Sequence, residues 1–201
     1  MIDVAILSCT FVLSVSCIVY FLSNKQLQKV QSYLFLAIMI NVSVSAVSDI
    51  VSNYIENTMI ATGTMFKWQY ATQIIFFVAH TTLAPLYALY VMMVNGSGLN
   101  RKSSFFYWVL TPLIISELLL ITNPITNWMF YYDENADFIR GPYEFILYIT
   151  AGLYLGISMY FMLRYRKAVT KETNIALWYF FSFTIIGIIV QLINSELKVE
   201  L

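Results

Sequence analysis

Six long apolar runs, separated by short polar segments, are the main pattern along the chain. Each run has 17 to 27 residues, and a helix needs roughly 20 to cross about 30 Å of hydrocarbon. The pattern therefore predicts an all-α fold, a polytopic membrane bundle of six spans that forms a single domain over residues 1–201. The predicted spans are residues 4–22, 33–55, 68–94, 105–121, 145–163 and 175–193.

The longest segment between runs, residues 123–144, is also the most acidic. Pro124 follows the fourth run and Gly141-Pro142 precedes the fifth, so we expect neither flanking helix to extend into this segment. Within it, residues 129–132 and 138–140 are aromatic and β-branched and flank a polar turn, which predicts two short strands. We expect an exposed β-hairpin between the fourth and fifth spans.

Composition also places the chain in a membrane, because 60% of its residues are hydrophobic and only 11% are charged. The net charge of zero gives no indication of nucleic-acid binding. Basic residues favour cytoplasmic loops, and here three alternate segments hold eight of the eleven, so we expect the N-terminus and the hairpin on the outer side. The eight are Lys25, Lys29, Arg101, Lys102, Arg164, Arg166, Lys167 and Lys171.

The sequence contains neither a His-Glu-x-x-His motif nor a phosphate-binding glycine loop. Its two cysteines, Cys9 and Cys17, lie within the first apolar run, where we expect small apolar fillers and no disulfide. His80 is the single histidine, and a zinc site needs several convergent ligands. We therefore expect no enzyme activity, no metal site and no cofactor.

Several polar residues interrupt the apolar runs, where an ionisable group is costly and faces the protein interior or water. At about 1.5 Å per residue, their depths place most of them in the outer half of the bundle, with His80 near the middle. This favours a polar cavity that opens outward beneath the hairpin; helix packing by the same groups is the alternative. The candidate ligand-binding residues are Asp49, Gln73, His80, Glu117, Arg140, Glu144 and Gln191.

For this cavity, we expect Asp49 and Glu117 to form the polar floor and the hairpin to form the lid. His80 either packs with a hydrogen bond or has a ligand-binding or proton-sensing role, and its protonated form could pair with Glu117 if the third and fourth helices are neighbours. Arg140 could instead close over an anionic group of a ligand.

Two further features concern helix packing. Gly152 and Gly156 form a Gly-x-x-x-Gly pair, for which we expect a close helix contact. Pro85 lies inside the third run and predicts a kink near Thr81.

One stretch of the chain resembles a known family. It comprises Tyr131-Tyr132-Asp133-Glu134-Asn135 and Ile139-Arg140-Gly141-Pro142, after Thr122-Asn123-Pro124 and before an aromatic run that Arg164-Tyr165-Arg166-Lys167 ends. In these residues the chain resembles the seven-helix N-terminal membrane input domain found ahead of diguanylate cyclase (GGDEF) or histidine kinase domains in bacteria. Outside residues 122–142 the likeness is one of hydropathy. Ala136 stands where members often carry Gly, and the family would add a seventh helix and a cytoplasmic effector after these six runs.

The resemblance implies a sensory input module in the bacterial cytoplasmic (inner) membrane, which detects an extracytoplasmic or intramembrane ligand. Its partners would be the lipid bilayer, an unidentified small molecule and a cytoplasmic cyclase or kinase output domain, with a homodimer left open and no nucleic acid. The alternative is a six-span substrate-binding subunit of a small-molecule importer. A retinal protein is disfavoured, because no lysine lies within an apolar run to form a Schiff base.

Overall fold

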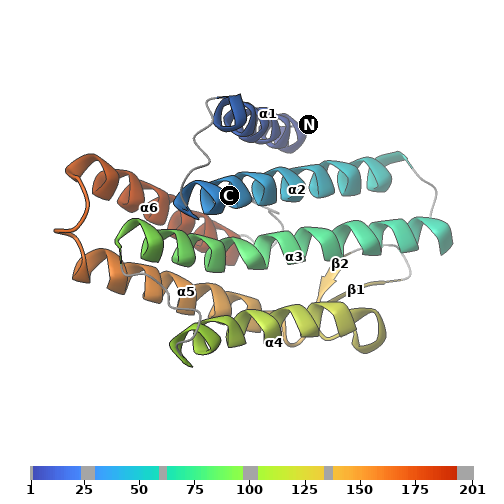
Figure 1. Ribbon diagram of the computed structural model, residues 1–201. Coiled ribbons are helices and arrows are strands. Elements are labelled where there is room, and N and C mark those ends of the chain that lie inside the picture. Colours follow the sequence, from blue (N-terminus) through green and yellow to red (C-terminus); the bar gives the residue numbers. More distant parts are fainter. Residues whose placement is uncertain (1, 24–29, 59–62, 97–103, 134–137, 194–201) are drawn as a thin grey trace.

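The computed structural model describes residues 2–23, 30–58, 63–96, 104–133 and 138–193 (Figure 1). Within these ranges the chain forms six helices and one two-stranded sheet. Every predicted apolar run is helical, which agrees with the expected all-α class. The elements are α1 (Ile2–Ser23), α2 (Val30–Thr58), α3 (Gly63–Val94), α4 (Ser104–Thr126), β1 (Phe130–Tyr132), β2 (Phe138–Arg140), α5 (Phe145–Arg164) and α6 (Lys171–Ile193).

Four of the described helices are long and apolar enough to cross a membrane: α2 over Val30–Ile55, α3 over Lys67–Val94, α4 over Tyr107–Thr126 and α5 over Phe145–Arg164. Helix α1 contributes a shorter apolar helix over Leu7–Ser23. Large apolar side chains also face outward, as lipid contact requires; examples are Val51, Ile121 and Leu153. Together these features indicate a helical membrane protein, while the number of six spans stays a prediction.

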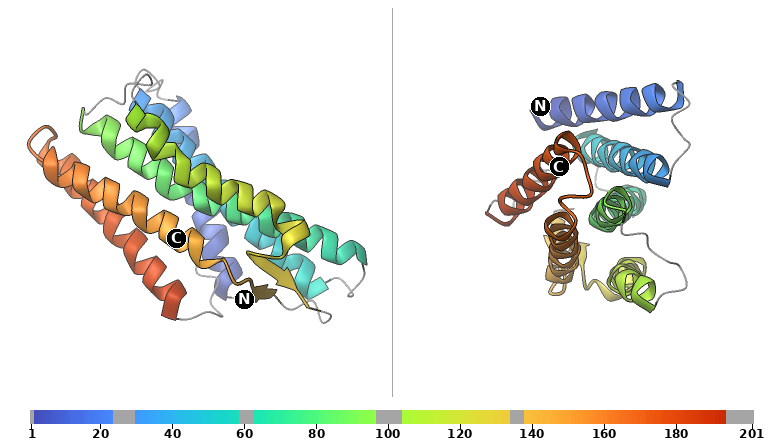
Figure 2. Two further views of the ribbon diagram at one scale, coloured as in Figure 1. Left: turned by 90° about the horizontal axis from the view of Figure 1, so that it is seen from below. Right: turned by 60° about the vertical axis from the view of Figure 1, so that its left-hand side comes forward.

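Helix α3 is the central helix of the bundle and contacts α2, α4 and α5 (Figures 1 and 2). Helix α1 packs against α2, and α6 packs against α5. A helix without a polar face is stable when neighbours cover it on several sides, and α3 is such a helix. It continues through Pro85, and Ala79, Ala88 and Val91 are all buried.

Polar side chains connect α1, α2 and α3 in this apolar setting. The Ser14 and Ser43 hydroxyl oxygens lie 2.7 Å apart, between α1 and α2. Asn41 of α2 donates through Nδ2 to the Ala79 carbonyl of α3 at 2.5 Å. Its Oδ1 accepts a hydrogen bond from Thr82 Oγ1 at 3.1 Å. Small polar residues of α2 therefore serve as contacts between helices.

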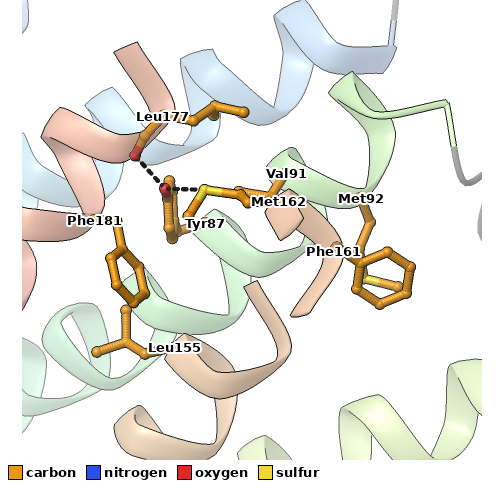
Figure 3. Packing of buried hydrophobic residues seen from close by; sticks show 8 residues of the cluster. All are labelled: Tyr87, Val91, Met92, Leu155, Phe161, Met162, Leu177 and Phe181. Atoms are coloured by element: carbon orange, nitrogen blue, oxygen red, sulfur yellow. Dashed lines mark hydrogen bonds between the residues drawn. The ribbon is translucent and has the colours of Figure 1, made fainter. Parts of the chain in front are cut away.

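The main apolar core lies between α3, α5 and α6 (Figure 3). The Tyr87 hydroxyl of α3 donates to the Leu177 carbonyl of α6 at 2.8 Å. Its ring stacks on Phe180, with 4.6 Å between the centroids. Tyr87 therefore positions α6 relative to α3. The buried members of this core are Tyr87, Val91, Met92, Leu155, Phe161, Met162, Leu177 and Phe181.

Strands β1 and β2 pair antiparallel between α4 and α5. The two predicted strands are therefore confirmed in position and type; the residues that join them lie outside the described ranges. The paired residues are Phe130 with Arg140, Tyr131 with Ile139 and Tyr132 with Phe138.

Asn123, fully buried in the last turn of α4, anchors this sheet. Its Oδ1 accepts hydrogen bonds from the Met129 and Phe130 amides at 2.7 and 3.4 Å. Its Nδ2 donates to the Phe130 carbonyl at 2.9 Å and to the Tyr70 hydroxyl of α3 at 2.5 Å. One side chain thus joins α4, β1 and α3 and uses both its donor hydrogens and both its acceptor positions.

The predicted end of the fourth helix is wrong, because α4 continues through Pro124 to Thr126. Pro124 removes one backbone N–H, but it does so in the last turn, where few hydrogen bonds follow. The Asn127 amide donates to the Asn123 carbonyl at 2.8 Å. Asn127 then ends the helix in the left-handed region, with a φ of 53°. The hydrogen bonds around Asn123 offset the one that Pro124 removes.

Glycines have different roles at two places. The Gly141 amide donates to the Met129 carbonyl at 2.8 Å, and a Cβ at this position would lie 2.2 Å from the Trp128 carbonyl oxygen. Only glycine allows this close approach. A Cβ at Gly152 or Gly156 would meet nothing within 4 Å. The predicted close helix contact at this pair is therefore wrong within the described chain, because α5 packs through its other face.

Replacing Gly141 with alanine tests this close approach. We expect Gly141→Ala to lower the free energy of unfolding by about 1–3 kcal/mol, the usual cost of overpacking, because the new methyl group meets backbone atoms. Gly156→Ala is the matched control; it should raise stability by up to about 1 kcal/mol through helix propensity. Chemical unfolding in detergent measures both variants. Equal stability of the two would contradict the packing described above.

Candidate functional site

A cavity of about 90 Å³ lies between α3, α5, α6 and strand β2, and we refer to it as the α3/α5/α6 cavity. Four of the seven predicted site residues line it: Gln73, His80, Arg140 and Glu144. The remaining lining residues are mainly apolar: Phe76, Phe77, Thr81, Leu83, Ala84, Tyr87, Phe138, Leu147, Tyr148, Ala151, Phe180 and Thr184. The cavity therefore combines an apolar wall with a small number of polar groups.

Aromatic rings form much of this wall. Phe76 and Phe77 come from α3, Phe138 from β2 and Phe180 from α6. The Phe77 and Phe138 rings stack with 6.3 Å between their centroids, which holds β2 against α3. The sheet thus takes part in the wall of the cavity.

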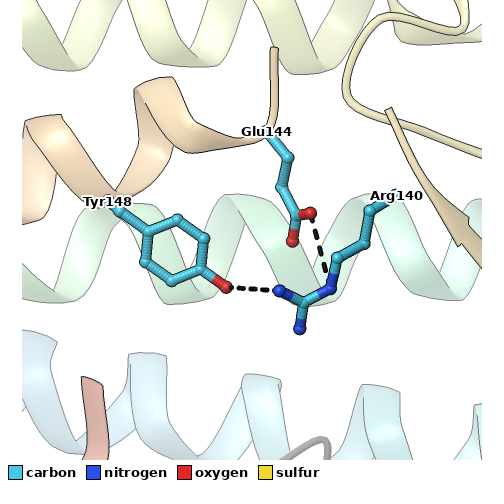
Figure 4. A network of polar contacts seen from close by, with 3 residues as sticks. All are labelled: Arg140, Glu144 and Tyr148. Carbon is cyan, nitrogen blue, oxygen red and sulfur yellow. Dashed lines mark hydrogen bonds and ion pairs between the residues drawn. The ribbon is translucent and has the colours of Figure 1, made fainter. Parts of the chain in front are cut away.

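Arg140, Glu144 and Tyr148 form a polar network in the cavity (Figure 4). Arg140 Nε lies 3.5 Å from Glu144 Oε2, and Nη1 donates to the Tyr148 hydroxyl at 3.3 Å. Glu144 and Tyr148 are four residues apart at the start of α5, so they share one face of the helix. The turn at Gly141 places Arg140 over that face.

Glu144 is the more buried member of the ion pair, with a side-chain exposure of 9% against 34% for Arg140. Burial raises the pKa of the Glu144 carboxyl, and the Arg140 guanidinium beside it partly opposes this shift. The proton on Glu144 is therefore sensitive to any change in the contact with Arg140.

Gln73 and His80 line the cavity from α3. Gln73 is 2% exposed and forms no hydrogen bond with another described residue, so its amide is an unpartnered polar group in the wall. The His80 ring stacks on Phe76, with centroids 5.6 Å apart. The hydrogen bond expected for a packed His80 does not form within the described ranges, and stacking holds the ring instead.

Glu117 lies behind the wall of the cavity, between α4 and α3. Its Oε1 accepts a hydrogen bond from Thr81 Oγ1 at 2.6 Å. Glu117 therefore pairs with Thr81, and no ion pair joins it to His80 within the described residues. Thr81 and His80 both line the cavity, but successive residues of a helix point about 100° apart, and the Thr81 hydroxyl is the one that reaches Glu117 of α4.

Asp49 is buried on α2 and is not among the residues that line the cavity. Neither Asp49 nor Glu117 therefore forms the floor of the α3/α5/α6 cavity. Depth along a helix axis follows from residue number, whereas the direction of a side chain depends on which neighbour covers each face. The side chain of Gln191 lies outside the described residues.

Tyr148 and the aromatic wall are not among the predicted site residues. Tyr148 lies four residues after Glu144, so a search for polar groups at helical spacing would have found it. The phenylalanines give no comparable signal, because large apolar residues fill every span.

Metal-binding and thiol groups do not add to this site. In the ranges that the structure describes, no group of three or more His, Cys, Asp or Glu side chains is arranged to hold a metal ion. Cys9 and Cys17 are free thiols exposed on α1.

Comparisons of the chain with protein-family models, with curated proteins and with solved structures find no match. Fold and site together define a class: a helical membrane protein with a small, mainly apolar cavity beside a two-stranded sheet.

Proposed function

We propose that the chain is the membrane-embedded sensory module of a bacterial signalling receptor and that it binds a small molecule in the α3/α5/α6 cavity. One observation carries this proposal: the buried amide of Gln73, which has no hydrogen-bond partner among the described residues, lines the same aromatic cavity as the charged pair of Arg140 and Glu144. Ligand sites typically combine an apolar wall with a few convergent polar groups. In this proposal the chain binds the ligand, and a cytoplasmic cyclase or kinase domain catalyses the enzymatic reaction.

The elements around the cavity support a route for the signal. A ligand there would contact Phe138 of β2, Tyr148 of α5 and Phe180 of α6. Phe180 stacks on Tyr87, whose hydroxyl fixes α6 to α3 through the Leu177 carbonyl. A ligand shifts a conformational equilibrium only by contacting its two states differently. Contacts at Phe180 would therefore change how α6 packs on α3.

The second candidate function is a substrate-binding subunit of a small-molecule importer, since a small apolar cavity also suits capture. The two functions predict different ligand-dependent enzyme activities in the complex that contains the chain. A complex purified from native membranes should show ligand-dependent diguanylate cyclase or autokinase activity if the chain is a sensor. ATP hydrolysis coupled to uptake, without either activity, would favour the importer and contradict the sensor.

We also propose six spans, with α1 and α6 crossing the membrane as well, and with the N-terminus and the sheet on the outer side of the bacterial cytoplasmic membrane. The bias of Lys and Arg toward alternate segments supports this orientation.

Thiol labelling tests the orientation. In a variant whose Cys9 and Cys17 are replaced by serine, a cysteine placed at Asn135 should react with an impermeant reagent in intact cells. A cysteine placed at Ser97 should react only after the membrane is opened, because the basic segment around it is assigned to the cytoplasm. The reverse pattern would contradict the proposed topology.

Filling the cavity tests the binding site. We expect Ala151→Trp to reduce binding of small probes by at least about tenfold, because Ala151 lines the cavity and the indole ring would occupy it. Leu153→Trp is the matched control: it adds an indole to the exposed face of α5 and should leave binding unchanged. Calorimetry with butanol, butylamine and butyrate measures the effect. Equal binding by both variants would place the site elsewhere.

A further inference from the structure

We propose that the α3/α5/α6 cavity takes a short aliphatic monocarboxylate, of about two to four carbon atoms, and that Glu144 takes up a proton when this anion binds beside Arg140. The inference rests on the proposed function and names the chemical class of its ligand.

The volume of the cavity limits the size of the ligand. It measures about 90 Å³, whereas an apolar cavity of about 150 Å³ holds one benzene molecule. Pockets for drug-sized ligands measure about 300–1,000 Å³. A chain of a few carbon atoms therefore fits among Phe76, Phe77 and Phe180 without a rearrangement of the helices.

Several polar side chains of the wall carry hydrogen-bond donors. Arg140 supplies a guanidinium, Tyr148 a hydroxyl and Gln73 an amide nitrogen, whereas Glu144 is the one carboxylate among the described lining residues. The Gln73 amide has no hydrogen-bond partner among the described residues although Gln73 is 2% exposed, and a buried polar group of this kind needs a hydrogen bond from water or a ligand. A carboxylate oxygen satisfies this need.

The contact between Glu144 and Arg140 is a single one. It joins Nε to Oε2 at 3.5 Å, longer than the roughly 2.7–2.9 Å of a strong charged hydrogen bond. A guanidinium can also bind a carboxylate through two parallel N–H bonds at its Nη edge. Among the described residues, Nη1 meets the Tyr148 hydroxyl at 3.3 Å, a neutral partner that an anion outcompetes. An amine ligand would instead meet the positive charge of Arg140.

Binding of an anion places a second carboxyl group beside the same guanidinium. Two carboxylates in one site repel each other, and a shared proton removes the repulsion. Burial already raises the pKa of the Glu144 carboxyl, so Glu144 is the group that takes the proton. With one proton taken up for each anion, binding weakens as the pH rises.

Other titratable groups also face the cavity, and their protonation must be distinguished from that of Glu144. They are His80 and Tyr87 from α3 and Tyr148 from α5; the residues of α6 in the wall, Phe180 and Thr184, carry none. Glu117 of α4 lies behind Thr81.

Titration calorimetry of the full chain in nanodiscs tests the ligand class with butyrate, butyramide and butylamine. We expect butyrate to bind at least about tenfold more tightly than either analogue, the lower limit for a charged hydrogen bond. Between about pH 6 and 8, the Kd of butyrate should rise about tenfold per pH unit, the slope for one proton per anion.

Two variants test whether Glu144 takes up the proton and whether the charge of Arg140 binds the anion. Glu144→Gln imitates the protonated carboxyl, so it should bind butyrate more tightly than the wild type at pH about 8 and with no dependence on pH. Arg140→Gln should weaken butyrate binding by at least about tenfold. Glu172→Gln changes an exposed carboxylate of α6 outside the cavity and should match the wild type throughout.

Three results would overturn the inference, and they are distinguishable. A pH slope that persists in Glu144→Gln means that His80 titrates or that neutral butyric acid binds. Binding of butylamine or butyramide as tight as that of butyrate rejects the anion, while the cavity remains a ligand site. Failure of butyrate, butyramide and butylamine alike to bind rejects the proposed function as well.

Discussion

The four hydrogen bonds of the buried Asn123 side chain are the constraint on which the site depends. A sheet of two strands is marginally stable alone, and this one has three residue pairs. Asn123 fixes β1 to α4 and, through Tyr70, to α3. Strand β2 pairs with β1 and supplies Phe138 and Arg140 to the cavity. Without this anchor, the α3/α5/α6 cavity would lose one of its walls.

The same geometry determines the electrostatics of the cavity. Gly141 allows the chain after β2 to approach the Trp128 carbonyl closely, and this turn sets Arg140 against the buried Glu144. Each charge would be costly alone in this apolar surrounding, and the 3.5 Å contact between the two is long. Such a contact, beside a Gln73 amide that has no hydrogen-bond partner among the described residues, is suited to a change of partners when a ligand binds. A tightly bidentate pair would resist that exchange.

The sequence allowed the helices and both strands to be predicted, because hydropathy over about 20 residues and turn residues around Pro124 and Gly141 are local signals. The sequence also indicated four residues of the cavity, because polar groups are rare in apolar runs. It did not indicate that Asp49 and Glu117 lie outside this cavity, because the depth of a residue follows from its number, whereas the neighbour that its face meets belongs to a distant part of the chain. The extension of α4 past Pro124 depends likewise on the tertiary contacts of Asn123.

Amide hydrogen exchange of the Asn123→Leu variant tests the central claim, that one side chain holds the sheet over the cavity. The leucine keeps the apolar volume and removes the four hydrogen bonds. We predict that exchange in β1 and β2 becomes at least about 30-fold faster, while amides near Val91 in α3 keep their wild-type rates. Wild-type protection of both strands in the variant would contradict the account.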